Sequence, residues 1–555
     1  MREKYWWLTE ESKSMLERGY LLPNQTVEDK LNSICKHAAS FYKDEEGLKE
    51  RFLELFERGW CSLSSPIWAN FGEERGLPIS CFSSFISDSM EGIYSSLYEV
   101  AMETKLGGGT SGYFGKLRPI GSPIKGGGVS SGLMSFVELF DTTTKVVSQA
   151  GVRRGAFAAY VDIDHPEIEK FLTVKDKQSE LQSINNAVCV SDEWMKSMED
   201  GDKEKREIWA KVLKSRREKG IPYIFFSDTV NKNKPQIYKD TNSTIHSSNL
   251  CLEIFLPTSE SESFVCCLMS MNLATYDEWK DTDAVKLAVM FLDAVMSDFI
   301  KKVKDIPSMY RTYNFAKRHR ALGLGVMGWH SLLQQKMIPF ESFSAQQLNT
   351  QIFKYLKEES YKSSVELGEK YGHAPIFEEV ETSDVKRRNT TLLALAPTTS
   401  SSSILGQVSP SIEPYASNYF VAGLAKGSFT RKNFELEKLL ESKGKNTEDV
   451  WKSIIQNQGS VQHLDFLSQE EKDVFKTFQE ISPFTIIQQA SARQAFIDQG
   501  QSLNLKIPSA MSIKDINKIH MESWKLGLKG LYYQRGTSVA KEAVLEMMEC
   551  KSCEA

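Results

Sequence analysis

Apolar residues return every three or four positions through the first part of the chain, as they do on one face of a helix. The pattern covers residues 27–41, and Thr26 with Asp29 has the spacing of a capping box that starts such a helix. A second amphipathic stretch follows over residues 47–59. Together they predict an N-terminal helical domain over residues 1–64.

The pattern changes at about residue 65. Short apolar runs now alternate with Gly-rich turns, as at 107–109 and 126–128, and with longer helical stretches, as at 284–299. Alternating strand and helix signals predict parallel strands joined by crossover helices. We therefore expect an α/β barrel or a doubly wound sheet over residues 65–538.

Two stretches in the second half of the chain stand apart from this pattern. Residues 430–480 are charged and helical, which predicts a small helical insertion. A helix is predicted to begin at Ser512, with Asp515 in capping register. Residues 539–555 are short and charged, and we expect them to form a flexible tail.

The overall composition excludes some classes of partner. The 555 residues are 41% hydrophobic and 25% charged, as in ordinary soluble proteins, and the net charge is −5. A protein that binds DNA or RNA would carry a basic footprint, which this balance lacks. The sequence contains neither an apolar run that could span a bilayer nor a signal peptide at its start. We expect a cytoplasmic protein that binds neither nucleic acid nor a membrane.

Nine cysteines should be mostly reduced thiols in such a protein, unless some are catalytic. Cys550 and Cys553 form a Cys-x-x-Cys pair at the C-terminal end. Such a pair could bind zinc, but no second ligand pair with suitable spacing accompanies it. Thiols at a chain end pack poorly, so we favour a redox role and expect no metal site.

The sharpest local motif is the hexapeptide from Asn249 to Ile254. In an extended segment alternate side chains point to opposite sides, so Asn249, Cys251 and Glu253 would share one face. An amide, a thiol and a carboxylate on an apolar strand are costly unless each finds a partner. Taken alone, the hexapeptide fits a reactive site and an ordinary strand with a buried cysteine equally well.

The Asn-x-Cys-x-Glu motif, with further matches over nearly the whole chain, resembles the large subunits of ribonucleotide reductases. The resemblance implies an N-terminal helical domain packed on a ten-stranded α/β barrel, with the motif on a finger loop through its centre. It implies that Cys251 becomes a transient thiyl radical, which takes the 3′-hydrogen of a ribonucleotide. Glu253 would act as general base on the 3′-hydroxyl, and Asn249 would orient the sugar.

Replacing a 2′-hydroxyl by hydrogen needs two electrons, which two thiols supply by becoming a disulfide. By the resemblance these thiols are Cys81 and Cys266, whereas the neighbouring Cys267 is structural. Cys550 and Cys553 would then reduce the disulfide, and thioredoxin or glutaredoxin would reset them.

Several hydroxyl-bearing positions resemble the family's substrate contacts. The Ser/Thr run over residues 396–403 matches a phosphate-binding turn, whose hydroxyls and backbone N–H groups suit an anion. The resemblance implies that the substrates are ribonucleoside diphosphates. The expected substrate-binding residues are Ser65, Ser80, Gly109, Thr398, Thr399, Ser400 and Ser401.

Tyr532 and Tyr533 indicate which subclass of ribonucleotide reductase the chain resembles. Adjacent aromatic residues are ordinarily core or interface residues. In this family, however, such a pair relays a radical from a separate small subunit, which contains a metal centre, to the active cysteine. The resemblance therefore implies a small-subunit partner that carries the radical cofactor, and no cofactor bound by this chain.

The resemblance also implies nucleoside triphosphate effectors (ATP, dATP, dTTP and dGTP) near the interface of a homodimer. Asp88 and Ser89 would lie at the effector ribose, and Arg118 at its phosphates. Gln149 and Arg154 would pass the identity of the base to the substrate site. We expect no N-terminal ATP-binding cone, because the chain opens almost directly into the helical domain. Control of overall activity would then be missing or sit on the partner.

The sequence thus predicts a ribonucleoside-diphosphate reductase catalytic subunit, and two alternatives stay open. An adenosylcobalamin-dependent reductase would share the cysteines but would not need the tyrosine pair. A catalytically silent, nucleotide-sensing relative would have no reason to hold all the cysteine sets together with Glu253.

Overall fold

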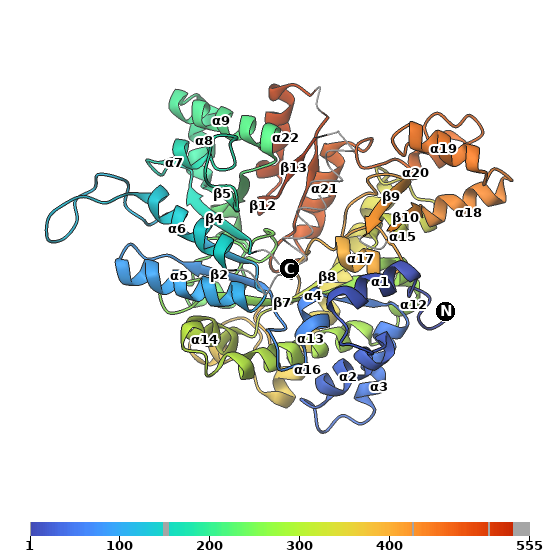
Figure 1. Cartoon of the computed structure of the whole chain (residues 1–555), viewed down its shortest axis with the longest axis horizontal. Coiled ribbons are helices and arrows are strands. Elements are labelled where there is room, and N and C mark those ends of the chain that lie inside the picture. Colours follow the sequence, from blue (N-terminus) through green and yellow to red (C-terminus); the bar gives the residue numbers. More distant parts are fainter. Residues whose placement is uncertain (1, 148–154, 425–426, 509–510, 537–555) are drawn as a thin grey trace.

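The chain folds around a barrel of β-strands near the centre of the computed structural model (Figure 1). The structure describes residues 2–147, 155–424, 427–508 and 511–536. Five parallel strands form one half of the barrel, and each pairs with the next strand along the chain. These are β2 (Cys81–Phe85), β3 (Thr110–Tyr113), β4 (Phe157–Asp162), β5 (Ile184–Val190) and β6 (Tyr223–Phe226).

The other half of the barrel runs antiparallel to the first. Its strand β7 (Phe264–Asn272) pairs antiparallel with β2 and parallel with β8 (Leu322–Met327). Residues 392–395 pair with β8 on one side and with residues 499–502 on the other. The segment that begins at residue 499 continues into the short strand β11 (Leu505–Lys506).

Residues 530–535 close the ring. Their first part, β12 (Gly530–Leu531), pairs with β6, and their last part, β13 (Gln534–Arg535), pairs with β11. Between them, the Tyr532 N–H donates to the Leu503 carbonyl at 3.0 Å. The two halves together confirm the predicted ten-stranded α/β barrel.

The finger loop, residues 246–263, joins the two halves and passes between opposite walls of the barrel. The Tyr160 hydroxyl on β4 donates to the Asn249 carbonyl at 2.7 Å, and the Gly500 N–H donates to the Glu253 carbonyl at 2.9 Å. A Cβ at Gly500 would lie 1.8 Å from the Phe255 ring of the loop. Glycine at position 500 therefore gives the loop the space it needs.

The prediction that residues 249–254 form an extended strand is wrong. This segment is a turn, in which the Leu252 N–H donates to the Asn249 carbonyl at 3.3 Å and Leu252 has a φ of 60°. The Asn249 side chain accepts the N–H groups of Glu253 and Ile254, each at 3.1 Å. These local side-chain bonds compete with strand pairing, and they keep Asn249 and Glu253 together without the alternation of a strand.

The N-terminal helices share one apolar core with the barrel. As predicted, a capping box at Thr26 starts α2 (Val27–Ala39), and α3 (Leu48–Glu57) follows. Both pack against α13 (Ala284–Val303), which extends the predicted helix 284–299 by four residues. The preceding helix α1 (Glu10–Gly19) packs instead against α17 (Thr399–Ile404).

Three helices protrude from the barrel in the stretch for which the sequence predicts an insertion (Figure 1). They are α18 (Phe434–Ser442), α19 (Glu448–Gln456) and α20 (Gln469–Val474). Trp451 anchors a small apolar core of their own. This unit therefore lies outside the main core.

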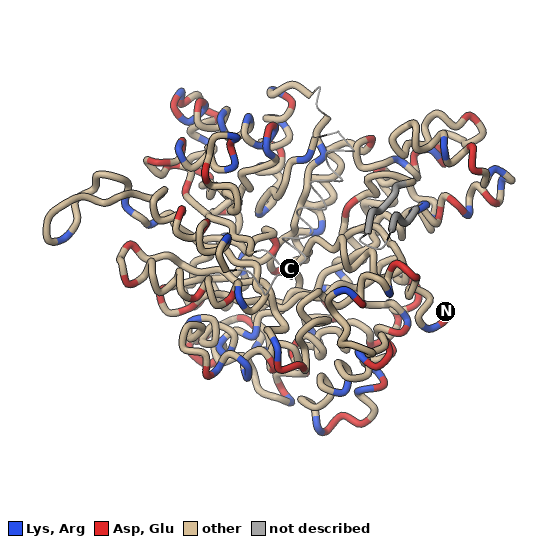
Figure 2. Tube along the Cα trace, in the orientation of Figure 1, with Lys and Arg blue, Asp and Glu red and all other residues tan. Residues whose placement is uncertain are grey.

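Acidic and basic residues are interspersed along the outer helices (Figure 2). Within the described part of the chain, no helix is both long and apolar enough to cross a membrane. Ser512 caps α22 (Ile513–Lys525), as predicted.

A buried ion cluster ties the helical layer to the barrel. Asp293 on α13 is 1% exposed and binds Arg320 at 2.8 Å and Arg388 at 3.2 Å. It also accepts hydrogen bonds from Asn389 and from Tyr42, which follows the N-terminal helix α2. Burial alone would raise the pKa of Asp293, but the two guanidinium groups outweigh it and the pKa is lowered.

We predict that Asp293→Asn lowers the free energy of unfolding by about 3–5 kcal/mol, because it leaves the buried Arg320 guanidinium and the partly buried Arg388 guanidinium without their counterion. A carboxylate with a lowered pKa stabilises the fold above its unfolded pKa, near 4, and loses this effect as the pH falls. The stability gap between wild type and variant should therefore shrink below about pH 4.

Urea unfolding at several pH values measures this gap. The exposed Asp281 on the preceding turn provides a control, since Asp281→Asn should change stability by no more than about 0.5 kcal/mol. Equal stability of Asp293→Asn and wild type at pH 7 would contradict the role of the cluster.

Candidate functional site

Cys251 lies in the turn of the finger loop and is 6% exposed. Its carbonyl accepts a hydrogen bond from the Ser502 hydroxyl at 2.6 Å. The same hydroxyl lies 3.0 Å from Oε2 of Glu253. Because Ser502 belongs to the barrel wall, one side chain ties both the thiol-bearing turn and the carboxylate to the barrel.

Asn249 completes this arrangement. Its Nδ2 donates to Oε1 of Glu253 at 2.9 Å, while its Oδ1 accepts the two backbone N–H groups of the turn. Asn249 and Glu253 are both 1% exposed. The structure therefore brings together the three motif residues that the sequence singled out.

Burial raises the pKa of Glu253 to about 7, and the hydrogen bonds from Asn249 and Ser502 oppose that rise. Near neutral pH the carboxyl can therefore exist in either protonation state. A carboxyl with this pKa can take up and return a proton at little cost, as a general base requires.

Cys81 and Cys266 lie directly opposite each other in the antiparallel pairing of β2 with β7. Directly opposed residues of such strands have Cα atoms about 4.5–5.5 Å apart, within the range that a disulfide spans. Both are free thiols in this structure. The pair can therefore be oxidised to a disulfide without moving the two strands far.

These thiols also lie close to the finger loop. Burial, Glu253 and Cys266 raise the pKa of Cys81 well above its ordinary value. Burial raises the pKa of Cys266 to about 12, although its Sγ accepts a bond from Gln499 at 3.4 Å. Both groups are thus protonated at neutral pH and can donate a proton.

Cys267 occupies the next position of β7 and points the other way. Its Sγ lies 3.3 Å from the Leu292 carbonyl of α13, in the helical layer. Cys267 therefore packs against the helical layer, and the assignment of Cys266 to the thiol pair stays a prediction.

Tyr532 and Tyr533 lie in one buried apolar cluster with Cys251. Their ring centroids are 4.4 Å apart. A third ring, Tyr223 of β6, lies 4.7 Å from Tyr532 and 5.1 Å from Tyr533. The three tyrosine rings and the finger-loop thiol therefore belong to the same buried cluster.

The predicted phosphate-binding turn begins where barrel residues 392–395 end. Thr398 is buried, and its hydroxyl lies 3.0 Å from that of Ser402. Ser401 donates to the Leu63 carbonyl at 3.4 Å, which brings the turn beside Ser65. Thr399 is exposed and Ser400 is buried.

Ser80 and Gly109 meet at the start of the parallel strands. The Gly109 N–H donates to the Ser80 carbonyl at 2.7 Å, and Gly109 forms a bridge with Cys81. A Cβ at Gly109 would lie 3.1 Å from Leu250 of the finger loop. These predicted substrate residues therefore border the thiol pair.

The predicted effector residues lie on another part of the surface. Arg118 donates to Asp88 at 2.7 Å, and Ser89 caps α5 (Met90–Lys105). The long loop that follows Arg118 projects from the molecule before α6 (Leu133–Val146) (Figure 1). The structure thus brings Asp88 and Arg118 together.

Gln149, Arg154, Cys550 and Cys553 lie outside the described residues. Within the described ranges, no group of three or more His, Cys, Asp or Glu side chains is arranged to hold a metal ion.

Sequence reasoning missed several residues that build the site. Ser502 and Gln499 hold the finger loop and Cys266, and Tyr160 and Tyr223 line the same interior. The polar run from Gln499 to Ser502 interrupts apolar surroundings. This feature of the sequence could have indicated that Gln499 and Ser502 contribute to the site.

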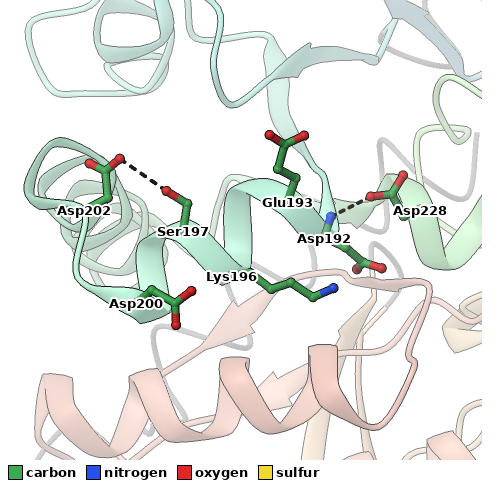
Figure 3. A pocket seen from close by; sticks show the side chains of 7 residues that line it. All are labelled: Asp192, Glu193, Lys196, Ser197, Asp200, Asp202 and Asp228. Atoms are coloured by element: carbon green, nitrogen blue, oxygen red, sulfur yellow. Dashed lines mark hydrogen bonds between the residues drawn. The ribbon is translucent and has the colours of Figure 1, made fainter.

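An acidic surface pocket lies apart from these residues, on α8 (Asp192–Asp200) and its neighbours (Figure 3). It is unsuited to an anionic nucleotide because carboxylates dominate its lining. The lining residues are Asp192, Glu193, Lys196, Ser197, Asp200, Asp202 and Asp228.

Comparison with known proteins agrees with this geometry. The model of the family "Ribonucleotide reductase, barrel domain" matches residues 79–205 and 202–534. The ribonucleoside-diphosphate reductase large subunit of Invertebrate iridescent virus 3 is 32% identical over 579 residues, with 90% of each chain covered. That of Danio rerio is 30% identical over 603 residues, which cover 94% of this chain and 74% of the relative.

A solved structure extends the likeness to three dimensions. The Actinobacillus ureae class Id ribonucleotide reductase alpha subunit is 49% identical and superposes with a TM-score of 0.92. The match covers 99% of this chain and 100% of the other. The protein belongs to the ribonucleotide reductase family.

Proposed function

We propose that this chain is the catalytic subunit of a ribonucleoside-diphosphate reductase, which makes 2′-deoxyribonucleotides by a thiyl-radical mechanism. One observation carries the proposal. The Cys251 turn and Glu253 share the Ser502 hydroxyl, beside strands that set Cys81 opposite Cys266. The reaction needs a thiol that can form a radical, a general base, and a dithiol that can supply two electrons.

The proposed steps use these groups in turn. The Cys251 thiyl radical takes the 3′-hydrogen, and Glu253 takes the proton of the 3′-hydroxyl. The 2′-hydroxyl leaves as water with a proton from the thiol pair. Cys81 and Cys266 together supply two electrons and the hydrogen that C2′ gains, and they become a disulfide. Glu253 returns its proton to the 3′-oxygen, and Cys251 returns its hydrogen to C3′ to regenerate the thiyl radical.

The starting radical has to come from outside this chain. A metal centre on a separate small subunit would supply it, and Tyr533 and Tyr532 would carry it to Cys251. The contact between the two rings supports this route. The solved relative is named a class Id alpha subunit, which favours a two-subunit enzyme over the cobalamin alternative.

The substrate would lie between the finger loop and the phosphate-binding turn. Ser65, Ser80 and Gly109 would line it, with Thr398, Thr399, Ser400 and Ser401 at the diphosphate. The two relatives named above are ribonucleoside-diphosphate reductases, which supports a diphosphate over a triphosphate.

Effectors and a homodimer complete the proposal. Nucleoside triphosphates would bind at Asp88, Ser89 and Arg118. Gln149 and Arg154 would pass the identity of the effector base to the substrate site. Tyr94 and Tyr98 are about half exposed on α5 next to this site, at 49% and 58%. Large apolar side chains exposed side by side support a second copy of the chain at this face.

The reaction can be tested by supplying the radical in different ways. We expect purified protein to reduce CDP with dithiothreitol, ATP and the cognate small subunit, and to make no product with adenosylcobalamin or with neither. Tyr532→Phe should abolish product and still bind nucleotide, because phenylalanine cannot be oxidised in the relay.

Tyr238→Phe, which alters a buried tyrosine bonded to Thr390, is the matched control and should stay active. Product with adenosylcobalamin alone would contradict the two-subunit mechanism. Nucleotide binding without product under any condition would favour the silent sensor.

Glu253 should ionise with a midpoint near pH 7, because burial disfavours its charged form. Infrared difference spectra of wild type against Glu253→Gln would follow its carboxyl band in the substrate-free protein. A base must be ionised, so kcat/KM should rise with pH through about 7. Ser502→Ala removes a bond that lowers the pKa and should move the midpoint upward. An ordinary midpoint near 4 would refute this account.

The C-terminal cysteines should matter for protein reductants only. Changing Cys550 and Cys553 to Ser should stop turnover with thioredoxin or glutaredoxin and spare turnover with dithiothreitol, which can reach the internal disulfide directly. Ser552→Ala, between the two cysteines, is the control and should behave as wild type. Equal loss with all reductants would rule out the shuttle.

A further inference from the structure

The N-terminal helix α1 is bonded directly to the predicted phosphate-binding turn. The Ser12 hydroxyl donates to the Ile404 carbonyl, the last residue of α17, at 2.7 Å. Ser12 is fully buried, so this bond is shielded from water. A segment nearly 400 residues away in sequence is therefore part of the wall behind the turn.

The loop after the turn is held by the same N-terminal segment. Glu11 is 2% exposed, accepts a bond from Gln407 at 3.0 Å and pairs with Arg431. The Trp6 ring packs on Gly406, where a Cβ would come within 2.7 Å of it. The contacts at Gly406 and Gln407 hold the loop after the turn against the N-terminal segment.

Tyr20, which follows α1, reaches the opposite side of the same region. Its N–H caps the helix at the Leu16 carbonyl, and its hydroxyl lies 2.9 Å from Oγ of Ser65. Ser401 of the turn bonds to the Leu63 carbonyl, two residues before Ser65. Tyr20 is thus one hydrogen bond away from a residue that borders the turn.

We propose that Tyr20 is a positioning residue for the phosphate end of the substrate and acts through Ser65. The inference rests on the proposed binding of substrate at Ser65 and the turn. A serine hydroxyl has one proton, and an anion can bind only as its acceptor. If Ser65 donates to a phosphate oxygen, Tyr20 must donate to Ser65, and the two bonds reinforce each other.

This chain of donors adds no charge to the site. The Tyr20 hydroxyl donates to the Ser65 oxygen, so that the single proton of the Ser65 hydroxyl points toward the substrate. Without Tyr20, Ser65 can rotate away or bond to its own backbone, and binding of the diphosphate weakens. The chemistry at Cys251 does not depend on this bond.

The test is Tyr20→Phe, which keeps the ring and removes the hydroxyl. We expect the KM for CDP to rise about fivefold, the effect of one hydrogen bond, with kcat within about twofold of wild type. Tyr5→Phe is the matched control: it removes a hydroxyl bonded to Glu57 in the same domain and should leave both constants unchanged. Thermal unfolding of both variants would be recorded alongside.

A double-mutant cycle separates this inference from the proposed function. Ser65→Ala should raise KM, and Tyr20→Phe with Ser65→Ala should raise it no further, because both changes break the same chain. A normal KM in Tyr20→Phe, or effects of the two changes that multiply, would overturn the role of Tyr20 and leave the substrate site intact.

Normal KM in Ser65→Ala as well would refute the proposed substrate site itself. A lower Tm with loss of kcat and no specific rise in KM would make Tyr20 a structural residue and also overturn the inference.

Discussion

The reactive turn is held inside the barrel by hydrogen bonds from opposite walls, and the rest of the site depends on this constraint. Ser502 and Gly500 hold it from one side, and Tyr160 holds it from the other. A loop without strand partners would otherwise leave its backbone groups unpaired in a dry interior, which is costly. The closed ring of strands supplies these partners and leaves the loop no room to shift.

Burial sets the chemistry of the groups around this turn. It raises the pKa of Glu253 to about 7 and keeps the thiols of Cys81 and Cys266 protonated. The same exclusion of water protects a thiyl radical from side reactions. The proton and hydrogen transfers proposed for the site thus need no group to be forced into an unfavourable state at neutral pH.

Alternating strand and helix signals are local properties of the chain, and they could predict an α/β barrel or a doubly wound sheet. The ten-stranded barrel came from the family resemblance. The sequence also singled out Asn249, Cys251 and Glu253, but for a wrong geometric reason. Strand alternation was expected, whereas the Asn249 side chain forms a turn with the following N–H groups. Composition and periodicity cannot reveal such a competition between a side chain and a strand partner.

The pairing of Cys81 with Cys266 came from the family resemblance, and the register of β2 against β7 gives it a structural basis. The contributions of Ser502, Gln499 and Tyr20 could not be predicted, because each depends on a contact between distant parts of the chain. A polar residue in an apolar run indicates that a partner exists and does not say which one.

A single turnover would test directly whether Cys81 and Cys266 supply the electrons of the reaction. The variant with Cys550 and Cys553 changed to Ser would be mixed with the small subunit and CDP without external reductant, and its thiols mapped by alkylation and mass spectrometry. We expect up to one dCDP per chain and a disulfide between Cys81 and Cys266, with no disulfide when Cys251 is changed to Ala. Product formed while Cys81 and Cys266 both remain reduced would contradict the account.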